Sequence, residues 1–161
     1  MPELITPRLR LIQQSRAQTL AMVDAMTRED RAQVSDAWLA LVRGPEERAR
    51  WGFSFAAMSA TGETIGSGGF KGPPEDGVVE IAYGVQPAHR GKGYASEIAA
   101  ALTDYALSRP EVMVVRAHTL AEGMASQRAL ARAGFAYVGE VIDPEDGPVT
   151  RFERKRTDQG K

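Results

Sequence analysis

The short segment 90–95 interleaves two cations with two glycines, in the order Arg-Gly-Lys-Gly-Tyr-Ala. A strand-like run, 78–83, precedes it, and a helix is predicted for 96–107 after it. The first turn of a helix has unpaired N–H groups and a partial positive charge, and glycines let an anion approach the backbone closely. The segment is therefore expected to bind a phosphate or a diphosphate group.

Two common phosphate-binding motifs do not fit this segment. A P-loop requires a glycine where Gln86 stands, and a Ser or Thr directly after Lys92, which is followed by glycine. The dinucleotide fingerprint G-x-G-x-x-G is matched by Gly91 and Gly93, but Ser96 takes the place of its third glycine. On spacing alone, a solvated loop at the start of a helix remains an alternative.

The segment 90–95 fits the R/Q-x-x-G-x-G/A motif of the GNAT superfamily, the acetyl-coenzyme-A-dependent N-acetyltransferases. The preceding run, 80–87, looks like the fourth strand of that family. The N-terminal run 4–11, Leu-Ile-Thr-Pro-Arg-Leu-Arg-Leu, resembles the start of its ribosomal-protein N-acetyltransferase-like branch. The segments 126–130 and 133–135 resemble the late helix and the following turn of that branch, so the resemblance spans most of the chain in order.

This resemblance implies an α/β fold of the α+β type. Its central sheet is expected to be mixed but mostly antiparallel, with about six or seven strands, a V-shaped split and about four flanking helices. A single N-acetyltransferase domain is expected over residues 1–161, with a frayed tail at 156–161.

Composition limits the classes of function. Of the 161 residues, 43% are hydrophobic and 25% charged, which is typical of a soluble globular protein, and the cytoplasm is the expected compartment. The net charge of −1 argues against a broad nucleic-acid surface. Without cysteine there is no disulfide and no cysteine nucleophile, and two histidines without HExxH spacing give no reason to expect a metal. The apolar runs are too short to span a membrane.

Periodicity predicts the elements that position the motif. A strand, a helix and a strand follow one another around it, which predicts a parallel pair joined by a right-handed crossover. Alternating patterns predict strands at 8–13, 51–58, 64–70, 78–85, 111–119, 135–142 and 149–155. Helical spacing predicts helices at 15–25, 28–42, 96–107 and 125–133.

Glu80 is the candidate general base. In the strand 78–85 it shares a face with Ala82 and Gly84, whose small size leaves space for water or a ligand beside the carboxylate. A surface glutamate paired with a cation is the structural alternative. The resemblance adds that a backbone N–H near Val85 would polarise the thioester carbonyl, with a bulge near the end of this strand.

The resemblance implies direct transfer of the acetyl group from acetyl-CoA, as cosubstrate, to a primary amine in a ternary complex. The acceptor would be a protein N-terminal α-amine or a small-molecule amine. At pH 7, deprotonation costs about 1 kcal/mol for an α-amine and about 4.6 kcal/mol for a lysine. A carboxylate acting through water can accept that proton.

The resemblance also assigns the cofactor contacts and raises a question about the departing thiolate. Many members carry N-x-x-A-x-x-x-Y, but Gly123 and Leu130 stand at the Asn and Tyr positions of this motif. Ser126 is therefore the candidate that donates a hydrogen bond to the thiolate sulfur, and Tyr137 is a weaker alternative. The structural alternative for Ser126 is local capping of the helix. The expected cofactor-binding residues are Val85, Arg90, Gly91, Lys92, Gly93, Tyr94 and Ala95.

The two histidines are interpreted without a catalytic role. His118 alternates away from Ala117 and Thr119, where the family binds cofactor, so it is interpreted as a satisfied structural or surface histidine. His89 lies in the turn itself, where contact with phosphate and a solvated loop histidine both remain open.

Two other classes of function remain open. One is a catalytically degenerate acyl-CoA-binding or regulatory module, motivated by Gly123 and Leu130. The other is a nucleotide-binding protein that uses the same turn. The sequence does not identify the amine acceptor, and the resemblance leaves a homodimer open.

Overall fold

A computed structural model describes residues 2–32, 34–120, 123–144 and 147–156. Its strands are β1 (Glu3–Ile5), β2 (Leu9–Gln13), β3 (Phe55–Ser59), β4 (Thr64–Phe70), β5 (Val78–Val85), β6 (Val114–Thr119), β7 (Ala136–Asp143) and β8 (Gly147–Lys155). Its helices are α1 (Arg16–Asp24), α2 (Arg28–Ala32), α3 (Asp36–Arg43), α4 (Glu46–Ala49), α5 (Tyr94–Leu107) and α6 (Met124–Arg132), with a 3₁₀ turn, η1 (Pro87–His89).

One sheet contains all the described strands, in the order β1-β2-β3-β4-β5-β6-β8-β7. Neighbouring strands are antiparallel except β5 and β6, which run parallel and are joined through α5. The predicted mixed, mostly antiparallel sheet is confirmed. It has eight strands in the described residues because the short β1, which was not predicted, pairs with β2.

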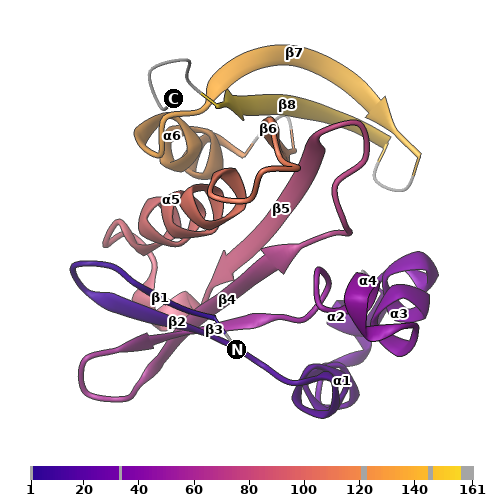
Figure 1. Cartoon of the computed structure of the whole chain (residues 1–161). Helices are drawn as coiled ribbons and strands as arrows, with labels where there is room; N and C mark the ends of the chain where they lie inside the picture. The colour runs from indigo at the N-terminus through magenta and orange to yellow at the C-terminus, as the bar shows by residue number, and fades with distance from the viewer. Residues whose placement is uncertain (1, 33, 121–122, 145–146, 157–161) are drawn as a thin grey trace.

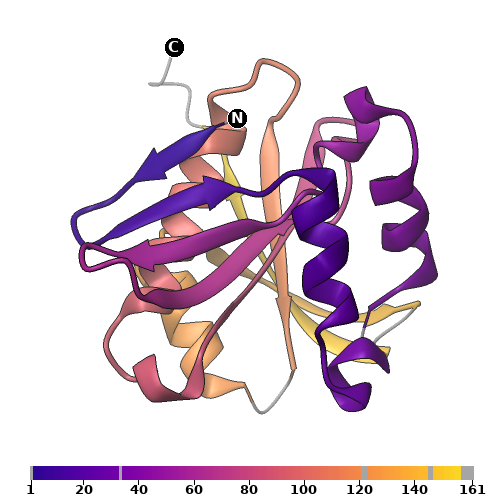
Figure 2. The same cartoon turned by 90° about the horizontal axis from the view of Figure 1, so that it is seen from below.

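Helices lie on both sides of this sheet (Figures 1 and 2). Helices α5 and α6 pack on one face, while α1 to α4 gather at the other side. A second, smaller apolar cluster, built from Val42, Ala49 and Phe53, lies among the latter helices. No helix in the described residues combines the length and apolarity that a membrane span requires.

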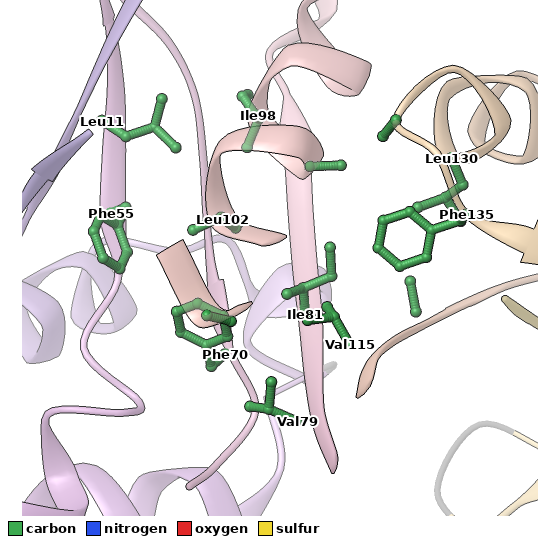
Figure 3. Packing of buried hydrophobic residues seen from close by; sticks show 14 of the residues in the cluster. Leu11, Phe55, Phe70, Val79, Ile81, Ile98, Leu102, Val115, Leu130 and Phe135 are labelled. Carbon is green, nitrogen blue, oxygen red and sulfur yellow. The ribbon is translucent and has the colours of Figure 1, made fainter. Parts of the chain in front are cut away.

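The main core lies between α5 and the sheet (Figure 3). Ile98 and Leu102 of the predicted α5 stripe are fully buried, against Phe55 and Phe70 from the sheet. Tyr94 and Tyr105, the other members of the stripe, are partly buried against the same cluster. The prediction that this stripe is core packing is confirmed, and it fixes the orientation of α5 on the sheet.

The predicted helix at 28–42 is in fact two helices, α2 and α3. The Ser35 side chain accepts a hydrogen bond from the N–H of Trp38 at 3.0 Å and so begins α3 as its N-cap. The strand predicted to begin at residue 51 begins only at Phe55.

The short helix α4, which was not predicted, precedes this strand. Pro45 stands just before α4, and the acidic residues in its first turn favour its N-terminus.

The C-terminal end of the chain departs from the expectation at one residue. Arg156 was predicted to begin a frayed tail, but its N–H donates to the carbonyl of Met113 at 2.8 Å, and its guanidinium donates to the carbonyl of Arg109 at 2.7 Å. The remaining tail, 157–161, lies outside the described residues. Arg156 is therefore part of the folded unit.

Gly66 generates a prediction about stability. A Cβ added there would lie 2.2 Å from the carbonyl oxygen of Gly84, a backbone atom that cannot move aside cheaply. Gly66→Ala is expected to lower the free energy of unfolding by about 1–3 kcal/mol, the usual effect of overpacking. Gly72→Ala is the matched control, since nothing lies within 4 Å of its added Cβ. Equal urea midpoints for the two variants would contradict this prediction.

Candidate functional site

The turn before α5 presents unpaired backbone N–H groups. Gly91 and Gly93 have φ of +78° and +85°, in the left-handed region that favours glycine. Gly93 is the N-cap of α5, and the first helical hydrogen bond runs from Glu97 N–H to its carbonyl at 3.3 Å. Within the described part of the chain, the N–H groups from Gly91 to Ser96 donate to no acceptor. Open N–H groups at the start of a helix are able to bind an anion.

Both cations of the turn are exposed, and one of them links the turn to the sheet. The Nε of Arg90 donates to the carbonyl of Val85 at 3.2 Å, so the turn folds back on the end of β5. Nε2 of His89 lies 3.2 Å from Glu63, and its side chain is only 13% exposed. Its ring centre lies 6.4 Å from that of Tyr94. Of the two alternatives left open for His89, this burial contradicts the solvated loop histidine.

Strands β5 and β6 separate beyond Glu80, which pairs with Arg116 in the last register pair between them. Lys71 N–H donates to the carbonyl of Glu80, and Gln86 N–H donates to that of Ile65, both at 2.9 Å. Even-numbered residues of β5 therefore direct their backbone groups to β4, and odd-numbered residues direct theirs to the opposite side.

The N–H groups of Tyr83 and Val85 consequently point into the gap from which β6 has departed. The pairing of β4 with β5 keeps one register throughout its length. The bulge that was expected near the end of this strand is therefore absent from the described pairing. The split itself, which was expected from the family resemblance, is formed by the separation of β5 from β6.

Glu80 lies in a chain of polar contacts across the sheet. Its Oε2 is 2.8 Å from Nδ1 of His118 and 3.2 Å from Nζ of Lys71. The Nε of Arg151 donates to Nε2 of His118 at 3.0 Å. The side chain of His118 is only 7% exposed. The prediction of a satisfied structural histidine is confirmed, and its partner is the candidate base.

These contacts determine the tautomer of His118. A guanidinium only donates hydrogen bonds, so Nε2 of His118 must be the unprotonated, accepting nitrogen. The proton of the neutral ring then lies on Nδ1, which donates to Glu80. Arg151 therefore fixes the ring that orients Glu80. Strand alternation predicts which face of its own strand Glu80 or His118 occupies. Only the register between β5 and β6, in which Glu80 pairs with Arg116, brings the two side chains together.

A cleft of about 970 Å³ opens between the helices on the α1 side and the sheet. Its floor includes Gly69 and Lys71 at the end of β4 and Ala82 of β5. Tyr83 also lines the cleft, and burial raises the pKa of its phenol to about 12, so that the phenol is neutral near pH 7. Apolar side chains contribute to the wall, among them Met22 of α1, Met26 after the end of α1, and Trp38 and Leu41 of α3.

The first turn of α6 brings a hydroxyl to the end of β6. Ser126 is exposed there, while Leu130, one turn later on the same face, is fully buried. The N-cap of α6 is Gly123, which has no side-chain cap, so Ser126 does not take the capping role. Tyr137 lies on β7, three strand spacings or about 14 Å from β5, and is 61% exposed.

The family resemblance placed Thr119, near the split, at a cofactor-binding position, but sequence reasoning did not name it as a candidate. Thr119 ends β6 and is buried, and its hydroxyl has no hydrogen-bond partner in the described residues. An unsatisfied buried hydroxyl costs about 1–3 kcal/mol, which a ligand amide would relieve. The described residues contain no group of three or more His, Asp or Glu side chains that could hold a metal.

Comparison with protein families gives a match over most of the chain. The model for the acetyltransferase (GNAT) domain matches residues 8–136. A curated relative, an uncharacterized N-acetyltransferase YjdG of Bacillus subtilis (strain 168), is 39% identical over 74 residues. That match covers 45% of this chain and 44% of the relative, so the chain matches less than half of the length of this relative.

Solved structures share the fold at low sequence identity. An aminoglycoside acetyltransferase in complex with coenzyme A and kanamycin has a TM-score of 0.70 at 20% identity, over 92% of this chain and 95% of that chain. A ribosomal-protein-S5-alanine acetyltransferase from Vibrio fischeri has a TM-score of 0.71 at 13% identity, over 98% of each chain. The predicted fold class is confirmed.

The polar chain through His118 generates a prediction for NMR of the ring nitrogens at neutral pH. His118 is expected as the neutral tautomer with the proton on Nδ1, because Arg151 donates to Nε2. Arg151→Met removes this donor and should populate the other tautomer. His89→Gln identifies the His118 signals, since the chain has two histidines. A ring of His118 that is protonated on Nε2 in the unmodified protein would rule out the assignment.

Proposed function

The chain belongs to the GNAT acetyltransferase family, and we propose that it transfers the acetyl group of acetyl-CoA directly to a primary amine. We place it in the ribosomal-protein N-acetyltransferase-like branch, on the strength of the N-terminal run 4–11 and the late helix. The observation that carries the proposal is the row of open N–H groups from Gly91 to Ser96, beside a strand that has parted from its neighbour.

The diphosphate of the donor would lie on these N–H groups, with the side chains of Arg90 and Lys92 adding positive charge. Gly91 supports this arrangement, because nothing lies within 4 Å of its added Cβ and an anion can approach. The pantetheine arm would follow the gap between β5 and β6. The unpartnered hydroxyl of Thr119 borders that gap and suits an amide of the arm.

The thioester carbonyl would be polarised by a backbone N–H that points into the split. Val85 and Tyr83 both offer such a donor. Val85 is five residues from Glu80, about 16 Å along a strand, whereas Tyr83 is three residues away, about 10 Å. Tyr83 therefore suits the carbonyl beside the base, and Val85 suits an amide of the pantetheine arm.

Glu80 is the proposed general base, acting through water on the acceptor ammonium. Its contacts with Lys71 and His118 involve Oε2, and Oε1 accepts no hydrogen bond from the described residues. One proton of the ammonium would pass through water to Oε1, and the amine would attack the thioester carbon. Breaking of the C–S bond would release CoA as the thiolate, which would take up the second proton that the nitrogen loses as the amide forms. Ser126, exposed at the first turn of α6, is the proposed hydrogen-bond donor to that sulfur.

The acceptor would enter the cleft on the α1 side of the sheet. The acceptor would then meet the donor at the split, because the register pairs between β5 and β6 end at Glu80. The cleft volume of about 970 Å³ accommodates a peptide N-terminus or a small-molecule amine. An α-amine is favoured over a lysine, because its deprotonation at pH 7 costs about 3.6 kcal/mol less.

Binding of acetyl-CoA is the first prediction of this proposal. Isothermal titration of the purified protein is expected to give a dissociation constant in the micromolar range or below, with thermal stabilisation by the ligand. ATP and NAD serve as controls, because a nucleotide-binding protein would prefer them. The absence of both heat and thermal shift with acetyl-CoA would refute the proposal.

Turnover by Glu80→Gln is the second prediction. Loss of the base is expected to lower kcat about 100-fold while the dissociation constant of acetyl-CoA stays within about twofold. Glu153→Gln is the matched control, since Glu153 is a paired carboxylate, 2.8 Å from Arg116, on β8, which neighbours β6. Release of CoA with a panel of amines provides the assay. Unchanged turnover in Glu80→Gln would remove Glu80 from the base role, and no CoA release with any amine would favour the degenerate binding module.

A further inference from the structure

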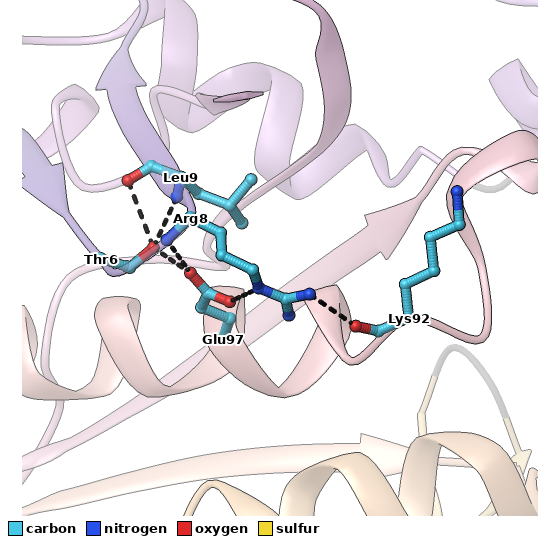
Figure 4. Close-up of polar contacts among 5 residues, drawn as sticks. All are labelled: Thr6, Arg8, Leu9, Lys92 and Glu97. Atoms are coloured by element: carbon cyan, nitrogen blue, oxygen red, sulfur yellow. Dashed lines mark hydrogen bonds and ion pairs between the residues drawn. The ribbon is translucent and has the colours of Figure 1, made fainter. Parts of the chain in front are cut away.

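Arg8 lies in the connection between β1 and β2, yet its side chain reaches the turn that precedes α5 (Figure 4). Its Nη1 donates to the carbonyl oxygen of Lys92 at 2.8 Å. Its guanidinium carbon lies 4.3 Å from the centre of the Tyr94 ring, which is a cation–π contact. Residues 84 positions apart in the sequence therefore meet at the candidate diphosphate site.

Glu97 holds Arg8 in this position. One carboxylate oxygen accepts from Nε of Arg8 at 2.8 Å, and the other accepts from the backbone N–H of Arg8 at 2.9 Å and from the hydroxyl of Thr6. Burial alone would raise the pKa of Glu97, but the donors from Thr6 and Arg8 outweigh it, so this pKa lies below its usual value. A charged carboxylate thus fixes both the backbone and the side chain of Arg8.

The contact with Lys92 sets the direction of one peptide group of the turn. The described chain contains no cis peptide, and in a trans peptide the C=O and N–H point in opposite directions. Because the Lys92 carbonyl points at Arg8, the N–H of Gly93 points away from it. The carbonyl oxygen, which would repel an anion, is thereby kept off the open side of the turn.

One nitrogen of the Arg8 guanidinium remains available to donate a hydrogen bond. Its Nη2 donates to no acceptor within the described residues, although Nε and Nη1 both do. Gly93 leaves room for it, because a Cβ added at that position would lie 3.3 Å from Nη2. Nη2 therefore lies beside the backbone on which the diphosphate is proposed to rest.

We propose that Arg8 is a further cofactor-binding and positioning residue. It orients the Lys92–Gly93 peptide group through Nη1 and offers Nη2 to a phosphate oxygen. This inference rests on the proposed function, since it takes the anion to be the diphosphate of a CoA donor. It extends the site from the turn to the N-terminal segment Thr6–Arg8, in which Arg8 lies 84 positions before Lys92.

The experiment compares two acetyl donors. Acetyl-pantetheine carries the thioester but lacks the diphosphate and the 3′-phosphoadenosine, so the ratio of kcat/KM for acetyl-CoA to that for acetyl-pantetheine reports the contacts with the nucleotide end of the donor, which includes the diphosphate. Arg8→Gln is expected to lower this ratio about tenfold, as for the loss of a hydrogen bond from a charged group. The change should come from a higher KM for acetyl-CoA at unchanged kcat. Arg8→Lys keeps the charge but loses the forked geometry, so it should restore the ratio only in part.

Arg10→Gln is the matched control, because Arg10 is a neighbouring exposed arginine that pairs with Glu3 at 2.6 Å and is not among the contacts of the turn. Its ratio should equal that of the unmodified protein. An equal loss with both donors in Arg8→Gln would assign Arg8 to fold stability alone and overturn the inference. If Arg8→Gln does not fold, the same ratio in Arg8→Lys decides. Failure of the unmodified protein to bind acetyl-CoA would instead overturn the proposed function.

Discussion

The backbone ladder between β5 and β6 ends at Glu80 and Arg116, and the rest of the candidate site depends on this early ending. Beyond it, β5 remains paired with β4, so its odd-numbered N–H groups face a gap with no strand to receive them. In the proposed site, this gap is the place where ligands bound on the two faces of the sheet would meet. In the proposed reaction, the donor approaches from the α5 side and the acceptor from the α1 side, so that the two substrates meet without crossing a closed sheet.

Two polar clusters hold the walls of this gap. On the donor side, Glu97 and Arg8 tie the β1–β2 connection to the turn. On the other wall, His118 and Arg151 orient Glu80 from the strands that lie beyond the split. Both clusters join segments distant in sequence, and in each an arginine donates to an acceptor, the Lys92 carbonyl or the His118 ring. Since an arginine only donates, each arrangement fixes the direction in which an acceptor group is turned.

Glycine has different physical roles in this site. Gly66 lets β4 approach β5 closely, because a side chain there would collide with the carbonyl of Gly84. Gly91 and Gly93 adopt left-handed backbone conformations that other residues rarely adopt. Gly123 begins α6 and stands where many relatives have an asparagine, while Leu130, at the position of their tyrosine, is fully buried in the core. Leu130 has no group that could donate to the thiolate, and Ser126 on α6 is the donor that we propose.

The sequence by itself determined the elements with strong local signals. Strands β4 and β5 have the predicted bounds, α5 buries the predicted stripe, and the glycines of 90–93 form a turn that precedes α5. These follow from periodicity and backbone preference, which act over a few residues. Apolar spacing was a weaker guide where an N-cap residue interrupts the spacing. At Ser35, the N-cap of α3, one predicted helix is divided into two. Only the tertiary structure decided the contacts of Glu80 with His118 and of Arg8 with Lys92, because strand register and the docking of β1 and β2 on α5 depend on the packing of the whole core.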